Sequence, residues 1–579
     1  MQTFSGVGVA PGRVLGPVRQ MPKPVQEPAP HAPGAADNPA DVTVESQGRR
    51  IKDAAKAVQA ELRARAAGAS GEGKEVLEAT ALMAADPMLV KSAIRLLSPE
   101  APGGARTAEL AVWEAAATVA ESLKALGGYM AERVADVLDV RARIVSELRG
   151  LPAPGIPASD VPFILAAEDL APADTATLDP TKVIALITSS GGPQSHTAIL
   201  ARALGLPAIV AAPGVDGLDD GTEIYLDGAA GTITTEPGED LRLAAKAWAT
   251  QASTLAAFSG NNALADGFRV PLLANVGTGA DAVRAADAGA EGVGLLRTEF
   301  CFLDRDDEPS VEEQIAAYGA VFAAFPGKKV VVRTLDAGAD KPLPFLTNAD
   351  EPNPALGVRG YRTDLTSPGV LERQLEAIAA AEAAHQAEVW VMAPMISTAD
   401  EAARFASLCS AAGLRAPGVM VEVPSAALTA STVLREVSFA SVGTNDLTQY
   451  AMAADRQLGP LASLNDPWQP AVLQLVKLTV DGAAAASTVP AGTAAAGTKP
   501  VGVCGEAAAD PALAVVLVGL GVATLSMSAR ALAAVSTVLA TVTVEQARNL
   551  AVAALAAPSA SAARQTVRAQ LPILDELGL

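Results

Sequence analysis

The sequence predicts a multidomain α/β protein whose C-terminal half is a (β/α)₈ barrel. From residue 270 onward, eight short apolar runs alternate with helical or loop segments, which is the rhythm of that fold. Polar residues stand at the C-terminal ends of several of these runs, where a barrel places its active site. Other doubly wound α/β folds remain an alternative, but a random scatter of charges would not give this placement.

Composition and charge narrow the functional class. The chain of 579 residues is long enough for three or four domains. Its formal net charge of −21 argues against a nucleic-acid partner, because a phosphate backbone would be repelled, but it does not exclude small anions. The three cysteines lie far apart without metal-ligand spacing, so we expect a reducing, cytoplasmic location. The apolar run 512–529 contains glycines and ends in serines, which favours a buried strand with its flanking helix over a membrane span.

Changes in the spacing of apolar residues along the sequence divide the chain into regions. Residues 1–21 and 150–235 hold short apolar runs between turn residues and predict one α/β domain. Residues 22–149 interrupt it with apolar positions three and four apart, which is typical of a helical bundle. The bundle lacks a cluster of catalytic residue types, so we interpret it as a packing or docking module. A polar-capped helix at 236–260 would link these parts to the barrel at 261–579.

The barrel strands are expected in order along the second half of the chain. The low-complexity stretch 483–500 precedes the seventh run and is expected to be a surface loop. The eight runs are PLLANV, GVGLLR, KKVVVRTL, VWVMAPM, GVMVEV, FASVGT, KPVGVCG and ATLSMS.

One histidine stands at the start of a predicted helix in GGPQSHTAILARALGLPAIV (191–210). Ser195 can cap this helix and Gly205 can end it. The positive end of the helix dipole favours the neutral, nucleophilic form of His196 and would stabilise a phosphoryl group placed on it. The local pattern fits a phosphorylated histidine and a histidine that only caps or packs equally well.

Four arginines lie near the expected strand ends. Arg297 in GLLRTEF and Arg333 in VRTLDAGADK follow adjacent strands, and Arg359 in NPALGVRGYR and Arg456 in AADRQLG can join them. Several guanidinium groups around one barrel mouth suit a small, multiply charged anion, because each can bind an oxyanion through two hydrogen bonds. Ordinary surface salt bridging explains any one of them, but not all four.

Two carboxylates and a thiol follow three consecutive strands. Glu422 in VMVEVPS and Asp446 in GTNDLTQY can hold one hard cation, and oxygen-only ligands with open positions favour Mg²⁺. An internal salt bridge is the alternative. Cys504 in VGVCGEAA could donate a proton to a substrate carbon, although a lone buried cysteine is usually inert packing.

These motifs resemble those of the phosphoenolpyruvate-utilising enzymes. GGPQSHTAILARALGLPAIV resembles their phosphohistidine signature, and GVMVEVPSAA with FASVGTNDLTQYAMAADR resembles their second signature, in the barrel. The domain order is similar to that of enzyme I, the phosphoenolpyruvate–protein phosphotransferase of the bacterial sugar phosphotransferase system. RTEFCFLDRDDEPSVEEQ, RTLDAGADKPLP, NPALGVRGYR and VGVCGE extend the resemblance over nearly the whole chain.

The resemblance implies a fold, an activity and partners. A swivelling phosphohistidine domain with an inserted helical bundle would precede a TIM-type barrel that binds phosphoenolpyruvate and forms a homodimer. His196 would take the phosphoryl group through Nε2, releasing pyruvate, and pass it to a histidine of the carrier protein HPr docked on residues 22–149. This transfer is the first step of sugar uptake by the phosphotransferase system.

The resemblance also assigns the site residues. Cys504 would protonate the enolate, and Glu422 and Asp446 would bind Mg²⁺. The residues implied for substrate binding are Arg297, Arg333, Lys341, Arg359, Asn445, Asp446 and Arg456.

Two alternatives differ in testable ways. A pyruvate,phosphate dikinase or phosphoenolpyruvate synthase relative would carry a large nucleotide-binding domain before the histidine domain. Here about 150 residues precede it, without a Gly-rich phosphate loop. A regulatory paralogue would bind partners without transferring phosphate, and the intact set of catalytic residue types argues against it.

Overall fold

The computed structural model divides the chain into two compact units. The first comprises Met1–Leu15, Ser190–Pro213 and Tyr225–Leu579, and the second comprises Gly16–Ser189 and Gly214–Ile224. The structure describes residues 2–23, 25–29, 43–68, 78, 80–102, 104–126, 134–157, 159–170, 178–192, 195–252, 258–303, 305–337, 343–347, 351–456, 458, 461–487, 499–577 and 579.

The second unit combines a helical bundle with parallel strands. A buried core that includes Ile51, Leu62, Val112 and Ile144 holds the helices together. The helices are α1 (Val44–Gly68), α3 (Pro87–Arg95), α4 (Ala108–Leu126) and α6 (Val134–Arg149). Parallel pairing joins the end of β3 (Arg13–Gln20) to β4 (Phe163–Ala167), and β4 to β5 (Val183–Thr188).

The first unit contains two antiparallel strand pairs beside the barrel. β1 (Thr3–Ser5) pairs with β8 (Thr232–Thr235), and β2 (Val7–Ala10) pairs with β6 (Ala208–Val210). The remaining elements before the barrel are β7 (Glu223–Asp227), α8 (His196–Leu204) and α9 (Glu239–Ala252).

A closed parallel barrel forms the rest of the first unit, so the predicted fold class is confirmed. Each of the eight apolar runs overlaps one strand, and the strands pair in chain order until the last pairs with the first. They are β9 (Leu272–Val276), β10 (Val293–Arg297), β11 (Lys329–Arg333), β12 (Glu388–Ala393), β13 (Pro417–Val421), β14 (Phe439–Val442), β15 (Val501–Val503) and β16 (Thr524–Met527).

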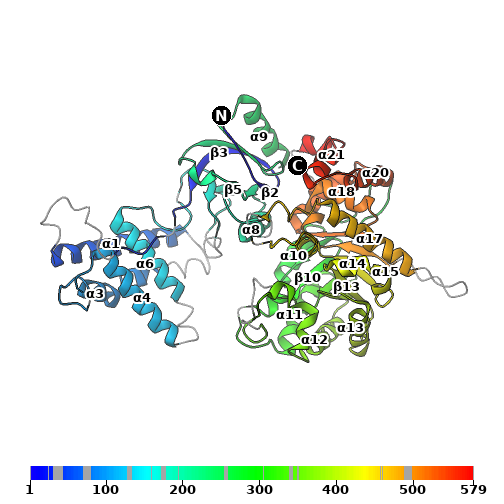
Figure 1. Ribbon diagram of the computed structural model, residues 1–579, viewed down its shortest axis with the longest axis horizontal. Coiled ribbons are helices and arrows are strands. Elements are labelled where there is room, and N and C mark those ends of the chain that lie inside the picture. Colours follow the sequence, from blue (N-terminus) through cyan, green and yellow to red (C-terminus); the bar gives the residue numbers. More distant parts are fainter. Residues whose placement is uncertain are drawn as a thin grey trace, which may run out of the picture. The chain divides into compact units, whose positions relative to one another are not determined.

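Helices surround these strands (Figure 1). Capping boxes begin four of them, at Thr278, Ser310, Thr398 and Thr543. The helices are α10 (Gly279–Asp287), α11 (Val311–Ala324), α12 (Val370–Ala384), α13 (Ala399–Ala411), α14 (Pro424–Leu428), α15 (Ala430–Val433), α16 (Thr444–Met452), α17 (Pro470–Ser487), α18 (Pro511–Gly519), α19 (Leu532–Leu539), α20 (Val544–Leu555), α21 (Ala560–Arg568) and α22 (Ile573–Leu577).

The apolar run 512–529 matches its expected structure, whereas part of the low-complexity segment 483–500 does not. The run 512–529 is the buried helix α18 followed by strand β16, as expected. No described helix is both long and apolar enough to cross a membrane. The segment 483–500 was expected to be a loop, but α17 continues to Ser487 because its alanines favour the helix. Residues 488–498 lie outside the described part of the chain.

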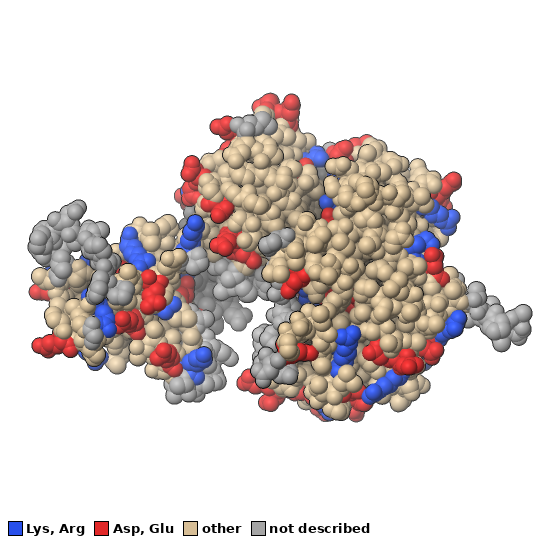
Figure 2. All heavy atoms as spheres, in the orientation of Figure 1, with Lys and Arg blue, Asp and Glu red and all other residues tan. Residues whose placement is uncertain are grey.

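Figure 2 shows how charged side chains are distributed on one face of the molecule. On the face drawn in Figure 2, acidic and basic side chains are interspersed rather than separated by sign. The charge therefore does not create a single acidic patch on that face.

Candidate active site

The polar residues predicted at strand ends meet at one end of the barrel. Arg297 and Arg333 are the last residues of β10 and β11. Glu422 directly follows β13, and Cys504 directly follows β15. The turn after β14 begins α16 with Asn445 and Asp446 in its first turn. Because all eight strands are parallel, these positions lie at the C-terminal mouth, where barrels of this type place their active sites.

Arg333 is held on two sides by carboxylates. Its Nη2 lies 2.9 Å from Glu299 Oε2, and its Nη1 lies 3.0 Å from Asp336 Oδ2. Its Nε is buried and has no hydrogen-bond partner among the described residues. An unpaired buried donor on a charged group is costly unless a ligand accepts its hydrogen. Arg333 is therefore oriented and incompletely satisfied, as an anion-binding residue should be.

Three buried carboxylates approach one another beside this arginine. Asp336, Glu422 and Asp446 each offer an oxygen within 4.8 Å of those of the other two. Burial, together with the negative charges of Asp446 and Asp336, raises the pKa of Glu422 to about 8. Burial opposes ionisation of Asp336 as well, but the Arg359 and Arg333 guanidinium groups outweigh it and lower its pKa to about 2. Such an oxygen-only group fits a hard divalent cation.

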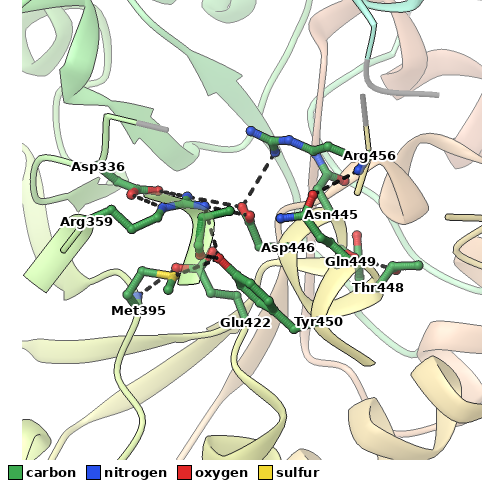
Figure 3. Close-up of polar contacts among 12 residues, drawn as sticks. Asp336, Arg359, Met395, Glu422, Asn445, Asp446, Thr448, Gln449, Tyr450 and Arg456 are labelled. Carbon is green, nitrogen blue, oxygen red and sulfur yellow. Dashed lines mark hydrogen bonds and ion pairs between the residues drawn. The ribbon is translucent and has the colours of Figure 1, made fainter. Parts of the chain in front are cut away.

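The Glu422 side chain is fixed by a backbone amide. Its Oε1 accepts a hydrogen bond of 2.7 Å from the Met395 N–H (Figure 3). Met395 has a φ of 61°, a left-handed conformation that is costly for a residue with a side chain. This conformation places the amide where it can orient the carboxylate.

The remaining predicted substrate-binding residues are distributed around α16. Arg359 lies between Asp336 and Asp446 and donates hydrogen bonds to both carboxylates (Figure 3). Arg456 Nη1 is 3.7 Å from Asp446 Oδ2, and Asn445 Oδ1 accepts a hydrogen bond of 3.2 Å from the backbone N–H two residues after Cys504. Lys341 lies outside the described residues.

Cys504 is buried inside the barrel. Its Sγ donates a 3.6 Å hydrogen bond to the Val442 carbonyl, and it packs in an apolar cluster with Leu295, Val331 and Met420. Burial raises the pKa of the thiol to about 11. The thiol is therefore protonated at neutral pH, which suits a proton donor and disfavours a thiolate nucleophile.

The helix that carries the predicted nucleophile has the expected ends. Ser195 Oγ accepts a hydrogen bond from the Ala198 N–H at 3.3 Å, and Gly205 ends the helix with a φ of 68°. His196 is the first residue of α8, and its side chain lies outside the described part of the structure. The backbone thus provides the helix N-terminus at which a phosphoryl group would be stabilised.

Within the first unit, α8 contacts the barrel. Arg202 Nε lies 2.9 Å from Glu506 Oε2, two residues beyond Cys504. Arg530, just after β16, donates a hydrogen bond to the carbonyl oxygen of Leu204. These contacts connect the histidine helix to the strand ends of the site.

Sequence reasoning missed several residues of this site. Asp336 and Glu299 orient Arg333, and Tyr450 accepts a 3.3 Å hydrogen bond from Arg359. Weak signals were present: Asp336 follows its strand by three residues, and Tyr450 is one helical turn after Asp446. The sequence carried no signal for the Met395 conformation.

Comparisons with known proteins show the family of the chain. Three family descriptions match: "PEP-utilising enzyme, PEP-binding domain" at residues 254–544, "PEP-utilising enzyme, mobile domain" at 160–231 and "PEP-utilising enzyme, N-terminal" at 5–133. A phosphoenolpyruvate-protein phosphotransferase of Streptomyces coelicolor is 52% identical over 573 residues, covering 98% of this chain and 99% of the relative. One from Haloferax volcanii is 40% identical over 522 residues, covering 87% and 88%. The chain therefore belongs to the PEP-utilising enzymes and, among them, to the phosphoenolpyruvate-protein phosphotransferase family, enzyme I.

Proposed function

We propose that the chain transfers the phosphoryl group of phosphoenolpyruvate to His196 and then to a histidine of the carrier protein HPr, as the first step of sugar uptake by the phosphotransferase system. The observation that carries this proposal is the convergence of oriented arginines, buried carboxylates and a protonated thiol at the barrel mouth. The α8 helix, which begins with His196, lies against the same barrel.

The arginines bind the anionic substrate. Arg333 offers an unsatisfied Nε, and Arg297 stands at the end of the adjacent strand. Arg359 and Arg456 both contact Asp446, Asn445 is its neighbour in the chain, and Lys341 completes the proposed set by resemblance. Guanidinium groups stabilise the charge on the transferring phosphoryl oxygens, and Arg333 is already oriented for this by two carboxylates.

Mg²⁺ is the cofactor that fits the acidic cluster. Glu422 and Asp446 would hold it, with Asp336 close enough to contribute. When bound, the ion would neutralise charge on the phosphoryl oxygens. Cys504 then protonates the enolate carbon, which makes the transfer proceed by forming pyruvate. The N-terminus of α8 stabilises the phosphoryl group on His196.

Each part of the chain has a proposed role. Residues 1–21 and 150–235 form the swivelling phosphohistidine domain, 22–149 the HPr-binding domain and 236–260 the linker. Residues 261–579 form the barrel that binds substrate and the second copy of a homodimer. The described cysteines are unpaired, which supports a cytoplasmic location.

The assay that tests this function measures transfer of a radiolabelled phosphoryl group from phosphoenolpyruvate to the two proteins. The chain is incubated with radiolabelled phosphoenolpyruvate, Mg²⁺ and HPr, and the products are treated with acid and with alkali. Acid-labile, alkali-stable label on both proteins is expected, and chelation of Mg²⁺ should prevent it. Label confined to the chain would refute the HPr step alone.

The bundle offers a surface for HPr that mutation can probe. Leu82 and Met88 are exposed by 64% and 68%, so both side chains are accessible to a partner. Replacing both with glutamate should lower the rate of transfer to HPr at least tenfold, because apolar contacts at the docking surface are lost, while phosphorylation of His196 stays unchanged. Val161→Glu is a matched control, since Val161 is also exposed in this unit. Equal loss in both variants would exclude Leu82 and Met88 as docking residues.

The ion pair between Arg202 and Glu506 should align the histidine helix for transfer. Glu506→Gln keeps the side-chain shape but removes the charge, so we expect the rate of His196 phosphorylation to fall roughly tenfold. The KM for phosphoenolpyruvate should not change. Arg202→Gln should have the same effect, and the double variant should be no slower than either. Additive losses would show that the two residues act separately.

A further inference from the structure

Asp446, a proposed metal ligand, already has a cation on its carboxylate. Arg359 Nη1 donates to Asp446 Oδ1 at 2.9 Å, and Arg359 Nη2 donates to Asp446 Oδ2 at 3.4 Å (Figure 3). Both side chains are buried, with 5% and 7% of their surface exposed. An incoming divalent ion must therefore compete with this guanidinium for the same oxygens.

A second carboxylate holds the same arginine independently. Arg359 Nε donates to Asp336 Oδ1 at 3.1 Å, and its Nη2 donates to Asp336 Oδ2 at 2.9 Å. Asp336 Oδ2 also pairs with Arg333, whose Nη1 lies 3.0 Å away. Asp336 thus binds the Nε edge of Arg359, while the Nη1 end donates hydrogen bonds to Asp446 and Tyr450.

The charge balance explains why a cation occupies this place. Three buried carboxylates lie together, and leaving buried charge uncompensated is strongly unfavourable. Arg359, which bonds two of these carboxylates, supplies most of that compensation, together with Arg333 at Asp336 and Arg456 at Asp446. A divalent ion held by the same carboxylates would supply positive charge there and would repel the Nη1 end from Asp446.

We propose that Arg359 is the counter-cation of the acidic cluster when the ion is absent, and that ion entry releases its Nη1 end from Asp446 to bind the substrate phosphate. Asp336 is a positioning residue that retains Arg359 during this exchange. The inference rests on the metal assignment proposed above. This exchange makes the ion and the anionic substrate bind cooperatively, because each favours the arrangement in which Arg359 Nη1 is away from Asp446.

Mn²⁺ affinity tests the exchange without measuring turnover. Mn²⁺ is titrated into the full chain without substrate, and free Mn²⁺ is measured by electron paramagnetic resonance. Arg359→Met removes the competing cation, so Mn²⁺ should bind at least fivefold more tightly than in wild type, although substrate binding weakens. Adding phospholactate, an unreactive substrate analogue, should tighten Mn²⁺ binding in wild type and have little effect in the variant.

A nearby arginine provides a matched control. Arg362 donates hydrogen bonds to the Gly357 carbonyl and to Ser397 Oγ, at 3.2 and 3.0 Å, and among the described residues it does not pair with the three carboxylates. Arg362→Met changes the net charge equally and should leave Mn²⁺ affinity unchanged. If Arg359→Met does not fold, Arg359→Lys keeps the charge but cannot bridge both carboxylates, so it should bind Mn²⁺ at least twofold more tightly than wild type.

The outcomes separate the two proposals. No Mn²⁺ binding by wild type overturns the metal site and the exchange together. Mn²⁺ binding that is equal or weaker in the Arg359 variants overturns the exchange but leaves the metal site standing. Equal tightening in Arg362→Met also overturns it, because the effect would then be one of net charge.

Discussion

Replacing His196 with alanine should reduce labelling of the chain by radiolabelled phosphoenolpyruvate below detection. Alanine offers no nitrogen to accept the phosphoryl group. The substitution should leave α8 intact, because Ser195 still caps it and alanine favours helix. Binding of phosphoenolpyruvate should survive, since the proposed anion-binding residues belong to the barrel. Gel separation of the labelled chain after brief incubation measures the effect.

The control for this variant is another histidine. His385 ends α12, and its ring lies edge-to-face against Phe322 with centroids 6.4 Å apart. His385→Ala should therefore retain labelling. Label on His196→Ala at the wild-type level would place the phosphoryl group on another residue and remove the assignment of the nucleophile.

The barrel could be predicted because each of its strands is marked by a short stretch of neighbouring residues in the sequence. Each apolar run is short, is bounded by turn residues and is followed by a helical or loop segment, so the sequence itself defines where strands begin and end. A parallel barrel then brings every strand end to one mouth, and Arg333, Glu422 and Cys504 become neighbours through topology alone.

The partner of each arginine in the site could not be predicted, because the pairs join segments that are distant in the sequence. Arg359 meets Asp446 across 87 positions of sequence and Asp336 across 23. Nothing in the residue pattern indicates which carboxylate each arginine chooses, since burial and charge balance in the folded site decide it. The loop predicted from residue 483 onward is wrong for a different reason, because the alanines after Gly482 favour continuation of α17 to Ser487.

Replacing Cys504 with alanine should slow pyruvate formation by roughly 10²–10⁴-fold, which is the usual contribution of a positioned acid or base. Binding of phosphoenolpyruvate should persist, because alanine fits the apolar surroundings of the thiol. Because the pKa of Cys504 is raised to about 11, its proton is retained below that pH. Loss of activity through ionisation of this thiol should therefore appear only as the pH approaches 11. Rapid-quench measurement of pyruvate, with substrate binding measured separately, distinguishes the two effects.

Cys409 separates proton donation from the general cost of losing a buried thiol. It is fully buried in α13, and burial raises the pKa of its thiol to about 12. Because Cys409 lies on a helix outside the strand ends, Cys409→Ala should retain the wild-type rate of pyruvate formation. A Cys504→Ala enzyme with unchanged turnover would exclude the thiol as the acid. A variant that lost substrate binding but kept its maximal rate would instead assign Cys504 to packing of the site, since an acid that acts on the enolate is required only after the substrate has bound.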